Sequence, residues 1–381
     1  MMTPPLDLFR AWAKDHGVTT RLVPKESKGM GTGLFVSLDQ DHPASDNQHS
    51  GELFFIPQSL LLSKSRVLLL DCPYLHSAFE LIGLDNLTER LALVLLLLHD
   101  RLALEHRECL SKLASTKDAP QGSATFTSSF FAPYVAMLPD VCTPVTLDPD
   151  LVKGYLAGTL LLDSVCAKRS KLESEFELLS GNLGVFERWP IQPSLENFIW
   201  ADATFWSRVL SFGTQWIQTP EDQKPGFELV DDLHMVPYLD FANHAGQPNI
   251  RWQMDEDGLR VWAKESLLER VAAEDEQDHT KDHKDSKDYE DSKDHEDSKD
   301  HEDSKDHEGP KEHKNPKDHE PEVYLSYGNK SNTELLFLYG FTLRNNPTQV
   351  LTLAMPMDED DPYYMPKAHT LMRMNIPPRI T

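Results

Sequence analysis

A charged, repetitive segment constrains the fold of this chain more than any other feature. Residues 285–308 are four tandem hexapeptides, DSKDYE followed by three copies of DSKDHE, inside a wider charged run at 274–322. The run has almost no apolar surface to bury, so folding could not offset its loss of conformational entropy, and the sequence predicts a disordered insert. Because strand patterns flank the run, strands that are distant in the sequence must pair.

We interpret the insert as a solvated loop between two strands of one sheet. A sheet tolerates such a loop because the entropy cost of closing it grows only with the logarithm of its length. The six-residue period matches no solenoid repeat and presents no hydrophobic face for stacking. The spaced histidines and aspartates leave metal binding open as an alternative role.

Composition limits the kinds of partner. The chain has 381 residues, of which 39% are hydrophobic, enough to fill a substantial core. Its formal charge is −25, and the run at 274–322, with 21 acidic and 9 basic side chains, contributes −12 of it. No basic stripe stands out, which argues against direct binding of nucleic acid. An acidic surface favours basic protein partners instead.

Cysteine usage and the apolar segments indicate a soluble intracellular protein. The apolar run at 91–98 is too short to span a bilayer, and the N-terminal residues lack the apolar core of a signal peptide. We therefore expect a cytoplasmic or nuclear monomer with no membrane partner and no bound metal. The four cysteines are far apart and form no Cys-x-x-Cys pair, which argues against a zinc knuckle and against a disulfide scaffold: Cys72, Cys109, Cys142 and Cys166.

The N-terminal two thirds of the chain change from strand to helix. Apolar runs at 33–38 and 51–57 predict two strands. Helical character follows from about residue 75 to 215, and it includes a helix at 87–104 that is apolar nearly all round and an amphipathic helix over 193–212 with Ser194 as its N-cap. The hydrophobic positions from Leu151 to Leu160 also follow the helical period.

Strand character then returns. We predict strands at 235–241, 249–254 and 259–265, with a turn at residues 255–258 joining the last two. After the charged run, the sequence EVYLSYG predicts a final strand, and the apolar pattern behind it predicts a helix.

Two loop-like stretches carry groups that suit ligand binding. The sequence GMGTGLF at 29–35 places three glycines just before a strand, which permits close approach of a ligand to the backbone, although a tight turn explains the glycines equally simply. Asp240, Asn243, His244 and Asn249 form a polar cluster directly after a strand pattern. The structural alternative for this cluster is an Asx-type turn with a structural histidine.

Two single residues also stand out. Arg208 falls on or beside the apolar stripe of its helix, so its guanidinium needs an anionic partner, which is either a structural carboxylate or the carboxylate of a ligand. Tyr327 ends a strand pattern on the same face as Val323 and Leu325. A buried phenol in such a place normally donates a hydrogen bond to a carbonyl.

Together these elements resemble a known family. The runs VPYLDFANHAGQPN and VYLSYGNKSNTELLFLYGF are similar to those of the SET-domain protein methyltransferases, in the subgroup of the Rubisco large-subunit lysine methyltransferase and the fungal ribosomal-protein lysine methyltransferases. The sequence WADATFWSRVLSF resembles the helix that carries the Ser-Arg pair of this subgroup, and GMGTGLF resembles its glycine-rich first turn. The resemblance covers roughly residues 17–345.

The resemblance implies an α+β fold, the SET-domain β-clip of small sheets interrupted by a long helical insertion and a disordered acidic loop. The implied parts are the N-terminal part of the SET domain at 17–62, the helical insertion at 63–230, the C-terminal part at 231–345 with the insert at 274–322 inside it, and a short tail at 346–381 in place of a longer, helical substrate-binding domain.

The resemblance also implies roles for individual residues. S-adenosylmethionine is the implied cofactor, and Tyr327 matches the tyrosine of the methyl-transfer centre. Tyr238 and Phe341 correspond to the substrate channel. The implied cofactor-binding residues are Met30 and Thr32 through their backbone groups, Arg208 facing the carboxylate, Asn243 and His244 at the amino and adenine ends, Asp240 supporting the turn, and Tyr339.

The implied activity is methyl transfer to a lysine amine of a protein substrate. A basic, lysine-bearing substrate suits the acidic chain, and ribosomal proteins are candidates. A catalytically silent scaffold that binds a basic protein partner is the alternative from another class. Methylation of histidine remains a further variant.

Overall fold

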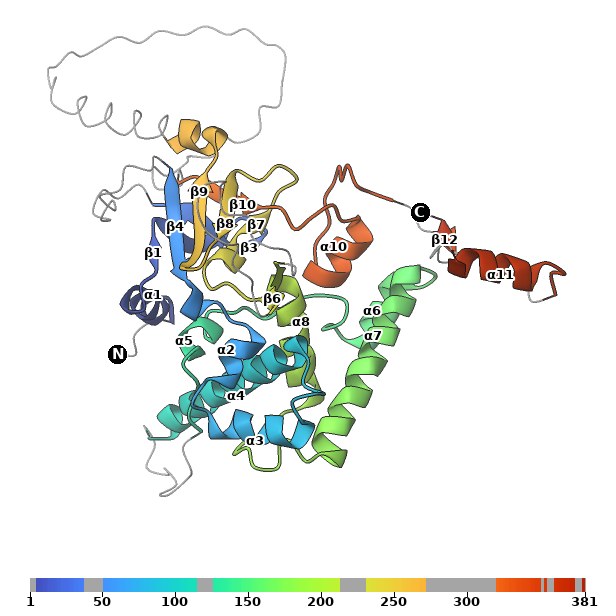
Figure 1. The fold of residues 1–381 in the computed structure, drawn as a ribbon, viewed down its shortest axis with the longest axis horizontal. Helices are drawn as coiled ribbons and strands as arrows, with labels where there is room; N and C mark the ends of the chain where they lie inside the picture. Colours follow the sequence, from blue (N-terminus) through green and yellow to red (C-terminus); the bar gives the residue numbers. More distant parts are fainter. Residues whose placement is uncertain are drawn as a thin grey trace, which may run out of the picture. The chain divides into compact units, whose positions relative to one another are not determined.

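The computed structural model describes residues 5–37, 51–114, 126–212, 231–271, 320–350, 353–354, 360–373 and 379–380 (Figure 1). The chain divides into two units, the first formed by residues 1–70 and 208–326 and the second by residues 71–207 and 327–381. Each unit is therefore built from two stretches that are distant in the sequence. The charged run falls almost entirely within residues 272–319, which lie outside the described residues. Residues 38–50, at the end of the first predicted strand and behind it, also lie outside them.

The first unit contains two four-stranded sheets. One has the order β1-β4-β9-β8, and all its pairs are antiparallel. The other has the order β2-β3-β10-β7, in which β10 runs antiparallel to β3 and parallel to β7. The strands are β1 (Thr19–Thr20), β2 (Leu22–Ser27), β3 (Gly31–Val36), β4 (Glu52–Pro57), β7 (Asn243–His244), β8 (Ile250–Met254), β9 (Gly258–Ala263) and β10 (Glu322–Leu325).

Shorter elements complete the first unit. The helix α1 precedes the sheets, and its Phe9 lies fully buried in the core of the unit, stacked on Tyr238 with 4.6 Å between the ring centroids. The other elements are α1 (Pro5–Asp15), the 3-10 turn η1 (Gln58–Leu60), α2 (Lys64–Leu68), β5 (Leu210–Ser211), β6 (Leu233–His234) and the 3-10 turn η3 (Leu239–Phe241). The strands β5 and β6 pair with each other.

Strands from distant parts of the sequence do pair, as the sequence requires. Glu322 pairs with Phe35 across β10 and β3, and Phe54 pairs with Val261 across β4 and β9. The interpretation of the charged run as a loop within one sheet is wrong, because β9 and β10, the described strands on either side of it, belong to different sheets. The strand partners of β10, which are β3 and β7, decide this assignment.

The strand predicted at 235–241 is also wrong. Met235 forms one isolated bridge with Leu62, after which the chain turns and closes the 3-10 turn η3. Pro237 has no N–H to donate to a ladder, and Tyr238 has a φ of 76°, which is outside the range of extended strands. The strands predicted around the turn at 255–258 are confirmed as β8 and β9, and the predicted final strand is confirmed as β10.

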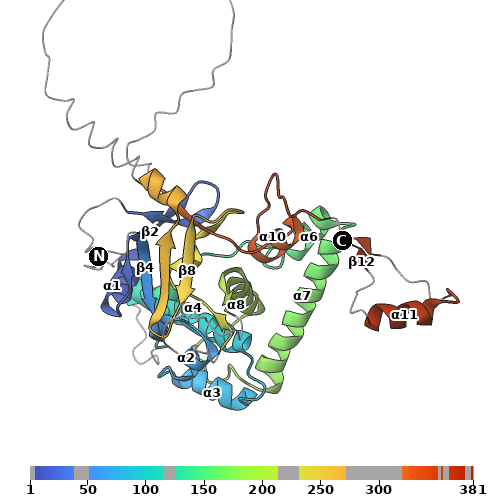
Figure 2. The same ribbon diagram turned by 45° about the horizontal axis from the view of Figure 1, so that its top comes forward.

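The second unit is mainly helical, and Figure 2 shows its long helix α7 from a second direction. The predicted helix at 87–104 is confirmed as the N-terminal part of α4, in which residues 92–98 are fully buried. The elements are α3 (Pro73–Ile82), α4 (Glu89–Ala114), α5 (Ala132–Val135), α6 (Pro149–Leu156), α7 (Leu160–Glu177) with its π-helical end η2 (Leu178–Asn182), α8 (Leu195–Arg208, of which Arg208 belongs to the first unit), α10 (Asn332–Tyr339), β11 (Leu353–Ala354), α11 (Tyr364–Arg373) and β12 (Arg379–Ile380).

Capping residues set the limits of these helices. Ser194 accepts a hydrogen bond from the backbone of Asn197 and so caps α8, as predicted. The pattern from Leu151 to Leu160 is divided between two helices, because Gly158 adopts a φ of 77° and Thr159 caps α7. In the part of the chain that the structure describes, no helix combines the length and the apolar character needed to cross a membrane.

Gly258 is the first residue of β9, and the space around it leaves no room for a side chain. Substitution of Gly258 therefore tests the pairing of β4 with β9. Its φ is 153°, and a Cβ atom there would lie 2.1 Å from the carbonyl oxygen of Ile56. We expect Gly258→Ala to lower the free energy of unfolding by about 3 kcal/mol, because the strand must shift or adopt a strained backbone. Gly246→Ala is the matched control, since a Cβ atom at Gly246 meets nothing within 4 Å. Urea unfolding measures both variants, and equal stabilities would contradict the expected close approach.

Candidate functional site

A buried carboxylate organises the polar groups of the second sheet in the first unit. Glu322 Oε2 accepts hydrogen bonds from the hydroxyl of Ser27 at 3.0 Å and from that of Tyr324 at 2.8 Å, and its Oε1 accepts one from Nδ2 of Asn243 at 2.8 Å. Glu322 is only 9% exposed. Burial raises the pKa of Tyr324 to about 12, and the hydrogen bond and charge of Glu322 add to this shift, so the Tyr324 phenol remains a donor.

Gly33 makes room for this carboxylate. A Cβ atom at Gly33 would lie 2.4 Å from Glu322 Oε1 and 2.9 Å from Asn243 Nδ2. Gly29, in the turn between β2 and β3, and Gly31, the first residue of β3, have positive φ angles of 75° and 74°. The three glycines thus serve both purposes considered from the sequence, a turn and a close approach, and the approaching group at Gly33 is a side chain of the protein.

Met30 and Thr32, the predicted backbone contacts of the cofactor, belong to the same hairpin. Met30 lies in the turn, where its N–H donates to the carbonyl oxygen of Ser27 and its side chain is 49% exposed. Thr32 lies in β3, paired with Glu26 of β2. Their contact with a cofactor stays a prediction.

Asn249 fixes the loop that carries Asn243 and His244 to β10. Its Nδ2 donates to the carbonyl oxygen of Glu322 and its Oδ1 accepts from the N–H of Tyr324, both at 2.8 Å. The short parallel pairing of β7 with β10 then sets Asn243 opposite Tyr324 and His244 opposite Leu325. Burial lowers the pKa of His244 below its ordinary value, and a hydrogen bond with the backbone of Leu325 opposes this shift. His244 is therefore mainly neutral at pH 7.

Arg208 has the inward position that its helix predicted. Its Nη1 donates to the backbone oxygen of Asp240 at 2.8 Å, and the guanidinium carbon lies 5.1 Å from the ring centroid of Phe241. The ion pair with the Asp240 carboxylate is long, at 3.5 Å. The buried Nε of Arg208 finds no hydrogen-bond partner among the described residues. A structural partner is thus present, and one guanidinium donor remains for another acceptor.

Tyr238, predicted in the substrate channel, is 2% exposed and packs in the core of the first unit against Phe9 and Phe54. Burial raises its pKa to about 12, which the charge of Arg10 partly opposes. Its positive φ of 76° costs on the order of 1 to 3 kcal/mol for a residue of this size. Packing against the surrounding aromatic rings holds the backbone of Tyr238 in this conformation. The chain turns at this residue on its way from Met235 to Asp240.

In the second unit, three predicted site residues form an aromatic cluster. The ring centroids of Tyr327 and Tyr339 are 4.7 Å apart, and those of Tyr339 and Phe341 are 6.1 Å apart. Burial raises the pKa of Tyr339, and the charge of Glu334 adds to the shift. Both tyrosine-glycine pairs fit backbone turns, since Gly328 and Gly340 have φ angles of 90° and 80°.

The helix α10 between these aromatic residues is closed by its own polar side chains. Ser331 and Glu334 form a reciprocal capping box, in which the backbone N–H of Ser331 lowers the pKa of Glu334. Asn332 exchanges two hydrogen bonds with the backbone of Leu343, and Asn346 donates to the backbone oxygen of Lys330. The motif KSNTE is therefore explained by the geometry of the turn that positions Tyr339 and Phe341.

Comparison with known proteins identifies this arrangement of strands. No family model matches the chain. SET domain-containing protein 8 of Schizosaccharomyces pombe is 29% identical over 114 residues, which are 30% of this chain and 22% of that protein. A crystal structure of the SET domain of LSMT bound to lysine and AdoHcy aligns with 99% of this chain and 66% of its own, with a TM-score of 0.58 and 17% identity. The chain has the SET-domain fold.

A structure of Rubisco LSMT bound to AdoMet gives the same result, with a TM-score of 0.58 and 16% identity over 100% of this chain and 66% of that one. The chain thus spans less than two thirds of the length of these relatives. Within the described residues, no group of three or more His, Cys, Asp or Glu side chains is placed to hold a metal ion.

Two residues form hydrogen bonds in the folded chain that the sequence did not indicate. Glu322 was not predicted as part of the site, although the strand alternation places it on the same face as Tyr324. Glu322 is acidic and lies at the edge of the charged run, so the sequence around it gives no sign that it is buried. Asn332 was part of the family motif, but its bonds to Leu343 appear only in the folded chain.

Removal of the Glu322 carboxylate should destabilise the second sheet. In Glu322→Ala one buried and two partly buried donors lose their acceptor, so we expect the free energy of unfolding to fall by about 3 kcal/mol. In Glu322→Gln the loss should be smaller, because the hydroxyls of Ser27 and Tyr324 can rotate to accept from the new amide. Urea unfolding of both variants tests this order, and equal losses would show that the hydrogen bonds do not carry the effect.

His244 should titrate below pH 6.5. Its burial disfavours the imidazolium, so the unfolded chain takes up a proton at a higher pH than the folded chain. The stability that neutral His244 contributes is full above pH 6.5 and decreases as the pH falls below that value. NMR titration of the imidazole resonances measures the midpoint, with His244→Gln to assign the signal. A midpoint at or above 6.5 would contradict the buried position.

Proposed function

We propose that this chain is an S-adenosylmethionine-dependent protein-lysine N-methyltransferase. The observation that carries the proposal is the fold likeness over essentially the whole chain to LSMT, whose structures hold lysine with AdoHcy, AdoMet, or monomethyllysine with sinefungin. We further propose a basic substrate protein, with ribosomal proteins as the first candidates, because the chain is strongly acidic. Groups within each unit support the proposal separately.

Two polar groups of the first unit fit the amino-acid end of S-adenosylmethionine. Arg208 Nε is a buried donor without a partner among the described residues, and a carboxylate is the acceptor that best suits a guanidinium. Asn243 uses its Nδ2 on Glu322, which accepts only, so its Oδ1 faces away from that bond and can accept from an ammonium group. Neutral His244, on the same short strand, can donate or accept a single hydrogen bond.

The aromatic cluster of the second unit suits the substrate amine. When bound, S-adenosylmethionine supplies a methyl group that a neutral amine can take. A lysine with a pKa of about 10.4 pays on the order of 4 to 5 kcal/mol to lose its proton at pH 7. The apolar rings of Tyr327 and Phe341 disfavour an ammonium by desolvation, which lowers that cost. The Tyr327 hydroxyl can then orient the amine by a hydrogen bond, so its main role is alignment.

Isothermal titration calorimetry with S-adenosylmethionine and transfer of labelled methyl groups to ribosomal proteins test the proposal. We expect Arg208→Lys to weaken cofactor binding tenfold or more, since a charge-assisted hydrogen bond is worth about 1.5 to 3 kcal/mol.

We expect Tyr327→Phe to bind the cofactor normally and to lose about 100-fold in kcat through misalignment of the amine.

Matched controls separate these roles from general damage. Arg344→Lys and Tyr363→Phe change exposed residues of the same types and should behave as the wild type. Thermal unfolding of every variant checks the fold. Absence of cofactor binding to the wild type would reject the enzyme and favour a SET-fold scaffold. Equal methyl transfer by the wild type and Tyr327→Phe would reject the role of Tyr327 alone.

A further inference from the structure

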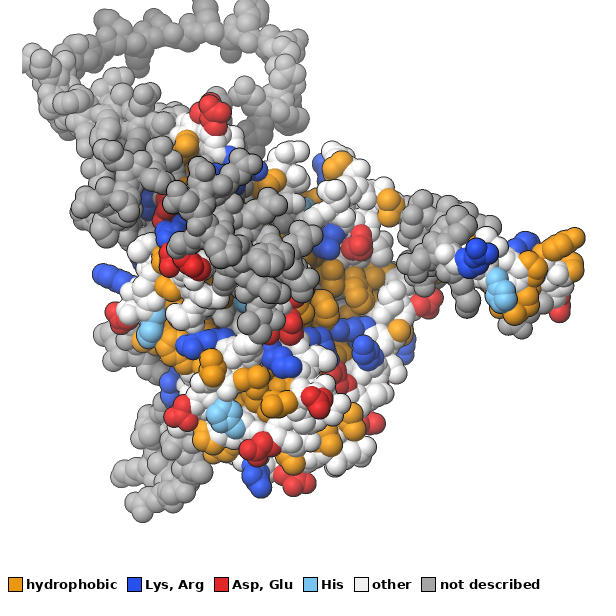
Figure 3. Space-filling model, viewed as in Figure 1, with side chains coloured by type: hydrophobic (Ala, Val, Ile, Leu, Met, Phe, Trp, Pro, Cys, Tyr) orange, Lys and Arg blue, Asp and Glu red, His pale blue; other side chains and the backbone are white. Residues whose placement is uncertain are grey.

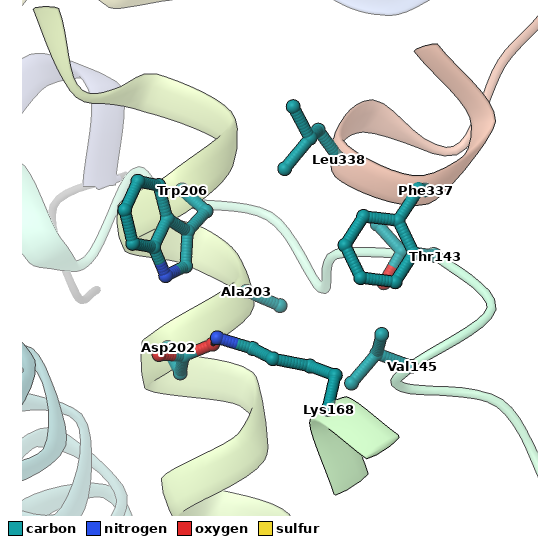
Figure 4. A pocket seen from close by; sticks show the side chains of 8 residues that line it. All are labelled: Thr143, Val145, Lys168, Asp202, Ala203, Trp206, Phe337 and Leu338. Atoms are coloured by element: carbon teal, nitrogen blue, oxygen red, sulfur yellow. Dashed lines mark ion pairs between the residues drawn. The ribbon is translucent and has the colours of Figure 1, made fainter. Parts of the chain in front are cut away.

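A pocket of about 230 Å³ lies in the second unit, outside the residues assigned to methyl transfer. Its apolar walls come from α8, α10 and the segment before α6, and they consist of Val145, Ala203, Trp206, Phe337 and Leu338 (Figure 4). Figure 3 shows hydrophobic side chains in a hollow between α10, α7 and α8, with Lys or Arg side chains at its edge. The pocket therefore offers a concave apolar surface to small molecules.

The charged groups at the pocket compensate one another. Lys168 Nζ contacts Asp202 Oδ2 at 2.7 Å, as Figure 4 shows, and Arg90 also pairs with the carboxylate of Asp202. Arg90 pairs in turn with Glu175. Two cations thus face two carboxylates, and Asp202 is 1% exposed. A neutral ligand suits this balance better than an anion, which would add an uncompensated charge beside Asp202.

Two buried polar atoms at the pocket have no hydrogen-bond partner in the described part of the chain. They are the indole Nε1 of Trp206, which can only donate, and the hydroxyl Oγ1 of Thr143. Thr143 is 2% exposed. A buried polar group without a partner destabilises the fold, so an acceptor atom that reaches one of these donors removes that cost. The two groups therefore favour a ligand that carries an accepting oxygen.

The walls of the pocket are held in place before any ligand binds. A Cβ atom at Gly340 would lie 1.9 Å from the carbonyl oxygen of Cys142, so the end of α10 packs directly on the backbone beside Thr143. Thr146 accepts a hydrogen bond from the N–H of Thr143 and fixes the same segment. A preformed pocket spares a ligand the cost of ordering these residues.

The volume restricts the ligand to a single ring. An apolar cavity of about 150 Å³ is known to hold benzene, and pockets for drug-sized molecules measure about 300 to 1,000 Å³. We propose that this pocket binds a small, uncharged, monocyclic aromatic molecule whose oxygen accepts a hydrogen bond from one of these two donors, Trp206 or Thr143. The proposal is independent of the proposed methyl transfer, because no residue of the aromatic cluster or of the first unit takes part.

Three ligands with equal numbers of non-hydrogen atoms test the proposal on the full chain. Acetophenone carries a neutral accepting oxygen, cumene has no polar atom, and benzoate carries a charge. We expect ligand-observed NMR to show saturable binding of acetophenone with a dissociation constant in the millimolar range. In the spectrum of the protein, the indole N–H resonance of Trp206 should shift in the same titration. Benzoate should bind at least tenfold more weakly. Absence of saturable acetophenone binding, or tighter binding of benzoate, would overturn the proposal.

Variants that remove each donor assign the hydrogen bond. Of Trp206→Phe and Thr143→Val, one should weaken acetophenone about fivefold to tenfold more than it weakens cumene, which corresponds to one net hydrogen bond. Equal losses for both ligands would reject the role of the donors. Ala203→Leu should abolish binding of both by filling the pocket, and unchanged binding would place the ligand elsewhere. Thermal unfolding confirms that each variant is folded, and the two donor variants decide the result if Ala203→Leu is not.

Discussion

The Glu322 carboxylate accepts hydrogen bonds from Ser27, Asn243 and Tyr324, which come from three different strands of one sheet. A buried carboxylate is stable only when such donors surround it, so the sheet and its polar centre form together. Gly33 is part of the same constraint, since any larger residue would occupy the space of the carboxylate. The positions of Asn243 and His244 therefore follow from where β10 docks.

Asn249 shows how one side chain extends a sheet beyond its backbone ladder. By donating to the carbonyl of Glu322 and accepting from the N–H of Tyr324, it fills the place of a neighbouring strand. The parallel pair of β7 and β10 has only two residues of register, which is too short to be stable by its backbone bonds alone. The amide of Asn249 thus helps to hold the segment of Asn243 and His244 against β10.

The second unit uses local polar bonds for the same purpose. Ser331, Glu334 and Asn332 close α10 and the loop behind it, and Gly340 allows the helix end to pack on residue 142. These contacts position the aromatic cluster on one side and the walls of the small pocket on the other. A ligand of the pocket would contact Phe337 and Leu338 of α10, the helix that ends in Tyr339.

The sequence by itself determined β3, β4, β8, β9, β10 and α10, since alternation, turn residues and caps are local signals within each segment. It also indicated the inward position of Arg208. Only the tertiary structure decided that β9 and β10 belong to different sheets, that residues 239–241 form a turn after Tyr238, and that Glu322 is buried. The physical reason is that strand partners, a positive φ held by core packing, and the donors around a carboxylate all come from residues distant in the sequence, which no local pattern records.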